Sequence, residues 1–245
     1  MQPRRVEVYG PGTDESYDVF EPAGPPAGVT VALVHGGMWS AQYDRHHLEP
    51  LAAALTREGW HVANVEYTRL GHPGGGWPGT GDSLLRGLQA VCADPDLPHP
   101  VVCLAHSAGG HLAVWAASEG RCDGLAGIIA LSAVLDLRSA SQGMLGYAVG
   151  AFLGGTPAEV PDAWAHADPT TARLTVPAVV LHGLVDELVP DSQASGYVAS
   201  RTPADAPSRL GLIEGAGHFE VIDPGHAAYA TVRAAVAELA GANGG

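Results

Sequence analysis

Basic residues are scarce in this sequence of 245 residues. It contains no lysine, and its 12 basic residues stand against 26 acidic ones, which gives a formal net charge of −14 at pH 7. A protein that binds nucleic acid or an anionic membrane needs clustered Lys and Arg on its surface. We therefore expect no nucleic-acid partner and no membrane association.

Long apolar runs and cysteines are also few. Residues 1–9 contain two arginines but no apolar segment, so they do not predict a signal peptide. No run approaches the roughly 20 apolar residues of a membrane helix. The three cysteines have no metal-ligand spacing, and their odd number leaves at least one unpaired. These features favour a cytoplasmic protein with reduced thiols and no metal site.

Apolar strands alternate with helical segments along most of the chain. Strands are predicted at 29–34, 61–65, 101–105, 125–132, 176–182 and 208–213. Helices are predicted at 44–58, 82–93, 109–118, 192–200 and 225–240. This alternation predicts one α/β domain over residues 1–245, with a mostly parallel central sheet that is covered by helices on both faces.

The segment between Asp136 and Pro177 departs from this alternation. It is rich in glycine and proline, and it is too long for an ordinary connection between two elements. We expect residues 137–175 to form a small cap insertion beside the site. The alternative is a loop-rich crossover that contains one ordinary helix.

Ser107 is the candidate nucleophile. It lies in Ala105-His106-Ser107-Ala108-Gly109, directly after an apolar strand and directly before a helix. A strand-to-helix turn exposes the serine at the edge of the sheet, and its strained backbone requires small neighbours. The small-x-Ser-x-Gly pattern arises often by chance in a chain so rich in Gly and Ala. The prediction therefore depends on the strand and helix around it.

A candidate acid and a candidate base follow Ser107 in the chain. Asp186 comes after the strand at 176–182, and His218 comes after the strand at 208–213. A serine hydroxyl needs a base to take its proton as it attacks. An aspartate that accepts a hydrogen bond from Nδ1 of that base fixes its tautomer. We therefore assign Asp186 as the acid and His218 as the base.

Three other residues compete for these two roles. Asp136 also follows an apolar strand and is the alternative acid. His106 and His111 flank the serine and are the alternative bases. Packing and hydrogen bonding around the turn is the role that we expect for both histidines.

A glycine pair after the first strand is the candidate oxyanion hole. Acyl transfer needs preorganised donors where the substrate oxygen gains negative charge. We expect one donor from the backbone of Ala108 and another from Gly37 or Met38, because glycine lets the loop turn its amides inward. His35 is expected to shape this loop by hydrogen bonding. The candidates for contact with substrate are His35, Trp39 and His106.

Several of these segments carry a resemblance to a known family. His35-Gly36-Gly37-Met38-Trp39 is similar to an HGGxW signature, and residues 105–112 are similar to a GHSAGGHL elbow with alanine in place of the first glycine. Residues 182–190 and 217–219 are similar to the acid and base loops of the same proteins. The sequence thus resembles kynurenine formamidase-like α/β-hydrolases, and the order Ser, Asp, His is that of α/β-hydrolase triads. Glu66-Tyr67 and residues 74–78 resemble esterases and prolyl oligopeptidase-type hydrolases of that superfamily.

The resemblance implies the α/β-hydrolase fold and a carboxylesterase-type or formamidase-type serine hydrolase. It implies hydrolysis of a small ester or an aryl formamide through an acyl-enzyme, with no metal and no cofactor. The partner is then a small-molecule substrate, and a homodimer stays open. One alternative is a biosynthetic thioesterase, cyclase or lyase that uses the same residues. A non-catalytic binding module is the other.

Overall fold

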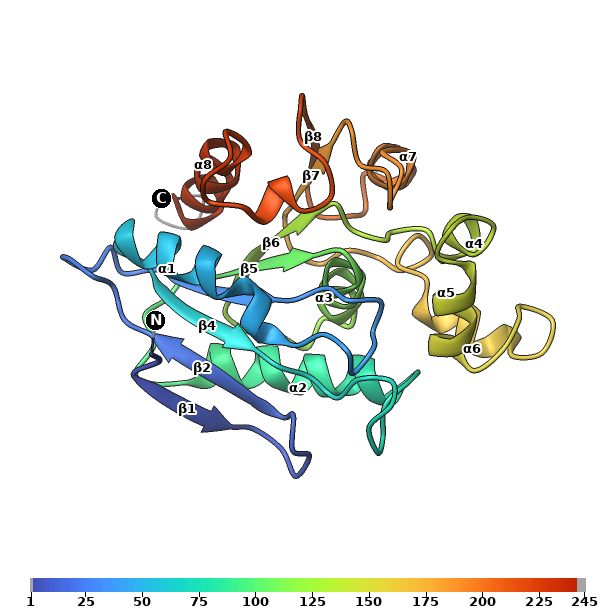
Figure 1. The fold of residues 1–245 in the computed structure, drawn as a ribbon, viewed down its shortest axis with the longest axis horizontal. Coiled ribbons are helices and arrows are strands. Elements are labelled where there is room, and N and C mark those ends of the chain that lie inside the picture. Colours follow the sequence, from blue (N-terminus) through green and yellow to red (C-terminus); the bar gives the residue numbers. More distant parts are fainter. Residues whose placement is uncertain (1, 242–245) are drawn as a thin grey trace.

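Eight strands form one sheet in the computed structural model, which describes residues 2–241 (Figure 1). Their order across the sheet is β1-β2-β4-β3-β5-β6-β7-β8. Strands β1 and β2 pair antiparallel with their neighbours, and the other strands are parallel. The strands are β1 (Arg5–Val8), β2 (Ser16–Phe20), β3 (Thr30–Val34), β4 (His61–Val65), β5 (Val101–His106), β6 (Leu125–Leu131), β7 (Ala178–Gly183) and β8 (Ser208–Ile213).

Helices cover both faces of this sheet. Helices α1 (Glu49–Arg57) and α8 (Ala228–Gly241) pack on one face, and α2 (Gly79–Ala93), α3 (Ala108–Ser118) and α7 (Ser192–Ser200) lie on the other. Two short 3₁₀ helices, η1 (Arg45–Leu48) and η2 (Glu220–Ile222), complete the loops near the site. The predicted α/β fold with a mostly parallel sheet between two helical layers is confirmed.

The strands of the sheet interior supply both apolar cores. In β3, Val31 and Leu33 belong to the core under α1 and α8, whereas Ala32 and Val34 belong to the core under α2 and α3. Side chains alternate between the two faces of a strand, so a strand that is covered on both faces is apolar throughout. This is why β3 appears in the sequence as an unbroken apolar run.

The predicted elements differ from the structure mainly at their ends. The strand at 61–65, the strand at 208–213 and the helix at 192–200 have the predicted bounds. The last helix begins at Ala228 instead of residue 225, because residues 223–227 form turns. The β1–β2 hairpin was not predicted, since β1 is short and alternates in polarity at the edge of the sheet.

Residues 137–175 contain three short helices. These are α4 (Leu137–Ser141), α5 (Gly146–Leu153) and α6 (Pro161–Ala167). They lie beyond the carboxyl ends of β5 and β6 in Figure 1. The alternative was a loop-rich crossover with one ordinary helix, whereas the segment contains three short helices. Among the helices described between residues 2 and 241, none has the length and apolarity needed to cross a bilayer.

The carboxyl ends of the parallel strands bring distant segments together. Strands β3, β5, β7 and β8 all end at the same edge of the sheet, because they run parallel. The loops after them contain the glycine pair, Ser107, Asp186 and His218, in that order. In open α/β sheets, ligands bind outside this edge.

Candidate active site

Ser107 sits at a strained turn between β5 and α3. Its backbone has φ 54° and ψ −122°, a conformation that L-residues rarely adopt. The turn brings the backbones so close that a Cβ on Gly109 would lie 2.2 Å from the carbonyl oxygen of His35. Glycine is therefore required at this position. The strain and the close packing hold the Ser107 hydroxyl at the sheet edge, above the N-terminus of α3.

His218 and Asp186 form a hydrogen-bonded chain with Ser107. Nε2 of His218 lies 3.0 Å from Oγ of Ser107, and Nδ1 lies 2.8 Å from Oδ2 of Asp186. The carboxylate can only accept, so Nδ1 carries the proton and its N–H donates a hydrogen bond to Asp186. Nε2 is then free to accept the hydrogen bond of the Ser107 hydroxyl. This tautomer is the one that a general base requires.

Asp186 is held as a carboxylate by its loop. Oδ1 accepts hydrogen bonds from the amides of Leu188 at 2.9 Å and Val189 at 2.8 Å. Burial alone would raise the pKa of Asp186, but the hydrogen bonds from His218 and from these amides outweigh burial and lower the pKa to about 2. Nε2 of His182 donates to the carbonyl oxygen of Val189 at 2.9 Å and braces the same loop.

The competing residues have other partners. The side chain of Asp136 accepts from the amide of Ser139 at 2.8 Å and caps α4, so it does not orient His218. His111 is fully buried, and burial lowers its pKa to about 4. The structure thus places neither of them in the hydrogen-bonded chain on Ser107.

His106 holds the main chain of the loop that contains His218. Its Nε2 lies 2.9 Å from the carbonyl oxygen of His218, which makes Nε2 a donor. Burial, with the electrostatic effect of the nearby His218 ring, lowers the pKa of His106 to about 3. His106 is therefore neutral. It lines the pocket, as expected for a candidate contact residue, but its N–H is used to hold the main chain of His218.

The glycine-pair loop has two amides without a protein acceptor among the described residues, those of Gly37 and Met38, and both residues line the pocket together with Ser107. Gly37 has φ +105°, and a Cβ there would lie 2.4 Å from the side chain of Tyr43, so only glycine fits. Met38 follows with φ 54°. Within residues 2–241, no protein group accepts a hydrogen bond from the amide of Gly37 or Met38. The amide of Ala108 is also unpaired within its helix, because it belongs to the first turn of α3.

Trp39 and His35 lie behind this loop and do not line the pocket. Trp39 is 1% exposed and stacks on Phe152 with ring centroids 4.5 Å apart. Its indole N–H donates to Nδ1 of His111 at 3.2 Å. His35 is 0% exposed and bonds to the protein through both ring nitrogens. The expectation that these two side chains contact substrate is corrected, since burial removes both from the pocket. His35 shapes the loop, as expected.

A cavity of about 480 Å³ opens beside Ser107. Methionine, leucine and aromatic side chains dominate its wall, and among the described residues no Arg, Asp or Glu lines it. Met144 and Phe219 are 73% and 60% exposed, so the cavity has an apolar mouth that is open to solvent. The lining residues are Gly37, Met38, Tyr43, His47, His106, Ser107, Met144, Leu145, Leu188, Val189, His218, Phe219 and Ile222.

Solved structures of esterases share this architecture, although the searches with protein-family models and of curated protein sequences found no match. Esterase B from Lactobacillus rhamnosis HN001 has 16% identity and a TM-score of 0.81, over 98% of this chain and 86% of its own. An esterase from the planctomycete Thermogutta terrifontis has 20% identity and a TM-score of 0.70, over 96% and 92%. A protein from Silicibacter sp. proposed to be a thioesterase has 25% identity and a TM-score of 0.68, over 90% and 81%.

The chain has the α/β-hydrolase fold. In this fold the serine elbow, the acid loop and the base loop come in that order along the chain, each after a strand that ends at the same edge of the sheet. Ser107, Asp186 and His218 occupy those three places here, after β5, β7 and β8. Across residues 2–241, no group of three or more His, Cys, Asp or Glu side chains is arranged to hold a metal ion.

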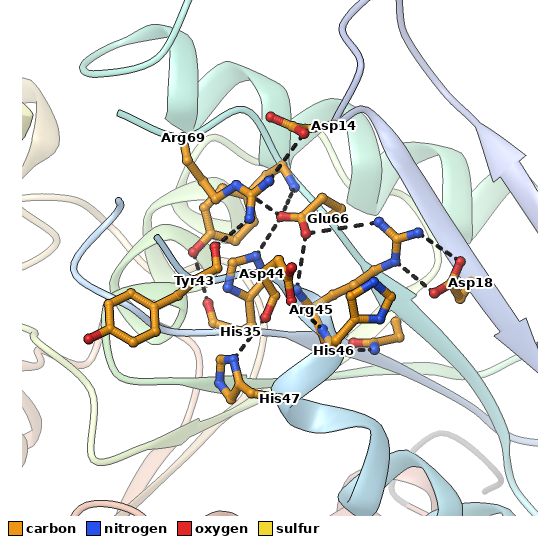
Figure 2. A network of polar contacts seen from close by, with 12 residues as sticks. Asp14, Asp18, His35, Tyr43, Asp44, Arg45, His46, His47, Glu66 and Arg69 are labelled. Carbon is orange, nitrogen blue, oxygen red and sulfur yellow. Dashed lines mark hydrogen bonds and ion pairs between the residues drawn. The ribbon is translucent and has the colours of Figure 1, made fainter. Parts of the chain in front are cut away.

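Sequence reasoning missed several residues around the site. Tyr43 and His47 come from the loop before α1 and from η1, and Leu188 follows Asp186, yet all three line the pocket. No pattern in the sequence points to them, because their role depends on how the loops pack. In the sequence, Glu66 stood out only through the resemblance of Glu66-Tyr67 to esterases and prolyl oligopeptidase-type hydrolases. It directly follows β4, the strand that pairs with β3. Figure 2 shows it at the centre of a network of polar contacts.

Proposed function

We propose that the protein is a serine hydrolase that cleaves small uncharged esters through an acyl-enzyme on Ser107. The observation that carries this proposal is the hydrogen-bonded chain from Ser107 through His218 to Asp186 beside an open apolar cavity. The esterase descriptions of the similar structures support the same class of reaction.

The reaction proceeds in two acyl-transfer steps. Oγ of Ser107 attacks the ester carbonyl while Nε2 of His218 takes the hydroxyl proton. The amides of Ala108 and of Gly37 or Met38 donate to the oxyanion of the tetrahedral intermediate. His218 then protonates the departing alcohol oxygen. In the second step His218 takes a proton from water, and the resulting hydroxide attacks the acyl carbon. The tetrahedral intermediate then breaks its bond to Oγ of Ser107, which takes the proton back from His218 as the acid is released.

The pocket favours substrates without formal charge. No Arg, Lys, Asp or Glu is among the described residues that line it, so an ammonium or carboxylate group would lose its water without gaining a counterion. N-formylkynurenine carries both groups on its amino-acid end. We therefore rank neutral esters, and neutral aryl formamides after them, above N-formylkynurenine as substrates.

Solvent access favours hydrolysis over cyclisation or elimination. A cyclase or lyase with this chemistry needs a site that excludes water from the acyl-enzyme. Here the cavity is open past Met144 and Phe219, both of which are largely exposed. Residues 137–175 contribute Met144 and Leu145 to its wall and act as a partial cap, which we propose sets the acyl-group preference.

Labelling and turnover test this function together. A fluorophosphonate probe is expected to add to Ser107, and p-nitrophenyl butyrate is expected to be hydrolysed with a net gain of one water in the products. Ser107→Ala should reduce hydrolysis to the background rate. The matched control is Ser132→Ala, which removes a buried hydroxyl with no hydrogen-bond partner at the end of the neighbouring strand β6. Full activity in Ser107→Ala would overturn the proposal.

A further inference from the structure

His35 is buried directly behind the oxyanion loop, where both of its ring nitrogens meet acceptors. It lies level with Glu66, because parallel strands β3 and β4 pair Val34 with Val65. Nε2 lies 2.7 Å from Oε1 of Glu66, and Nδ1 lies 2.7 Å from the carbonyl oxygen of Gly36 (Figure 2). A carbonyl and a carboxylate have no proton to donate, so both nitrogens donate. Only the imidazolium form of histidine has two N–H groups.

The partner Glu66 is ionised, which excludes a neutral pair. Its Oε1 also accepts from the Tyr67 amide at 3.1 Å, and its Oε2 accepts from the Arg45 amide at 3.0 Å. The guanidinium of Arg69 lies 3.3 Å from Oε1 as an ion pair. Burial would raise the pKa of Glu66, but the contacts with His35, Arg69 and Arg45 outweigh it and lower the pKa. Glu66 therefore has no proton to give to His35.

The carboxylate of Glu66 shares its surroundings with other charged groups. Two arginines near Glu66 already have carboxylate partners of their own, within the network of Figure 2. These pairs are Arg45 with Asp18, at 2.7 and 2.9 Å, and Arg69 with Asp14, at 3.1 Å. Arg69 also reaches Glu66, and Nδ1 of His72 contacts Asp14, so the arginines are shared among three carboxylates. A cationic His35 gives the buried carboxylate of Glu66 a counterion at hydrogen-bond distance.

Two aromatic rings enclose the imidazole. Tyr67 stacks on it with ring centroids 4.4 Å apart and an interplanar angle of 13°, and the face of an aromatic ring attracts a cation. His47 meets it edge-on at 5.7 Å. Burial and the charge of His35 lower the pKa of His47, and its Nδ1 donates to the carbonyl oxygen of Asp44. His47 is thus a neutral neighbour that does not compete for Glu66.

We propose that His35 is a positioning residue held as a buried imidazolium, which ties the carbonyl of Gly36 to Glu66 and so directs the next amides of the loop toward the substrate oxygen. With the Gly36 carbonyl turned back to His35, the amides of Gly37 and Met38 remain free to face Ser107. The positive charge behind the loop also favours the negative charge that develops in front of it. The catalytic part of this inference rests on the proposed esterase function.

Nuclear magnetic resonance of the full-length protein, labelled with ¹⁵N in histidine, tests the protonation directly. At pH 8 an ordinary histidine, with a pKa of about 6.5, is neutral. We expect both ring nitrogens of His35 to carry protons at that pH, with the signals assigned by their loss in His35→Gln. His111 is the internal control, because it accepts from Trp39 and donates to the carbonyl of Ala167, which leaves one bare nitrogen. A ring nitrogen of His35 that carries no proton at pH 8 would overturn the proposal.

The variant Glu66→Gln tests the positioning role. Glutamine keeps an acceptor for His35 but removes the counterion, so His35 loses a proton at high pH and releases one of its two bonds. We expect kcat on p-nitrophenyl butyrate to fall by about 10²-fold at pH 8, the scale of a 1 Å misplacement, with KM little changed. The ratio of variant to wild-type kcat should rise as the pH falls, because His35 is then protonated again.

The control for this experiment is Glu49→Gln. Glu49 pairs with His46 at 2.8 Å in the same chemical arrangement, but on the surface, and kcat should stay within about twofold of wild type. A ratio for Glu66→Gln that does not change with pH would mean a merely structural glutamate and would overturn the positioning role. If the wild-type protein hydrolyses no ester, the proposed function fails, whereas the resonance experiment still decides the charge of His35.

Discussion

Asp186→Asn changes one oxygen to an amide nitrogen, and the structure predicts which way the new amide will point. Oδ1 accepts from two backbone amides, those of Leu188 and Val189. The carbonyl oxygen of asparagine must take that place, because an NH₂ group there would face two donors. The NH₂ group then points at Nδ1 of His218 and makes it an acceptor. The imidazole then carries its proton on Nε2, and a protonated Nε2 cannot take the proton of the Ser107 hydroxyl.

The expected loss is about 10⁴-fold in kcat, or about 5 kcal/mol of transition-state stabilisation. Initial rates on p-nitrophenyl butyrate measure this loss in kcat, and circular dichroism checks that the variant is folded. Asp136→Asn is the matched control, since asparagine still caps α4 and kcat should not change. The reasoning is refuted if Asp186→Asn stays within tenfold of wild type, or if Asp136→Asn loses activity to the same degree.

Three further predictions follow from the same geometry. The depressed pKa of Asp186, about 2 against an ordinary value of about 3.9, means that its contribution to stability is present above pH 4 and lost as the pH falls through 2. The difference in the free energy of unfolding between wild type and Asp186→Asn, measured in urea, should therefore shrink as the pH falls from 5 to 2.5, and a constant difference would contradict this. His106→Phe leaves the carbonyl of His218 unpaired and should lower kcat by about 10²-fold with little change in KM, whereas an unchanged kcat would exclude the bracing role. Trp39→Ala removes a buried ring stacked on Phe152 and should lower the free energy of unfolding by about 3–5 kcal/mol, and a loss below 1 kcal/mol in urea titration would show that the ring does not anchor the loop.

Much of the fold could be predicted because the interior strands are buried on both faces. Such strands are apolar throughout, so β3, β5 and β7 stand out from the polar loops that follow them. The β1–β2 hairpin lies at the sheet edge and lacks that signal. Residues 137–175 gave no usable periodicity either, because α4, α5 and α6 are each eight residues or shorter.

The sequence by itself determined the residue types and their order, with Ser107 after one strand and Asp186 and His218 after later ones. This was sufficient because parallel strands deliver their following loops to one edge of the sheet, whatever the side chains around them. Only the tertiary structure decided which neighbours serve them. Trp39 and His35 belong to the same short motif as Gly37, yet folding buries both of them behind the loop. The hydrogen-bond partner of His35 is Glu66, 31 residues away, because such partners are set by packing and not by proximity in the chain.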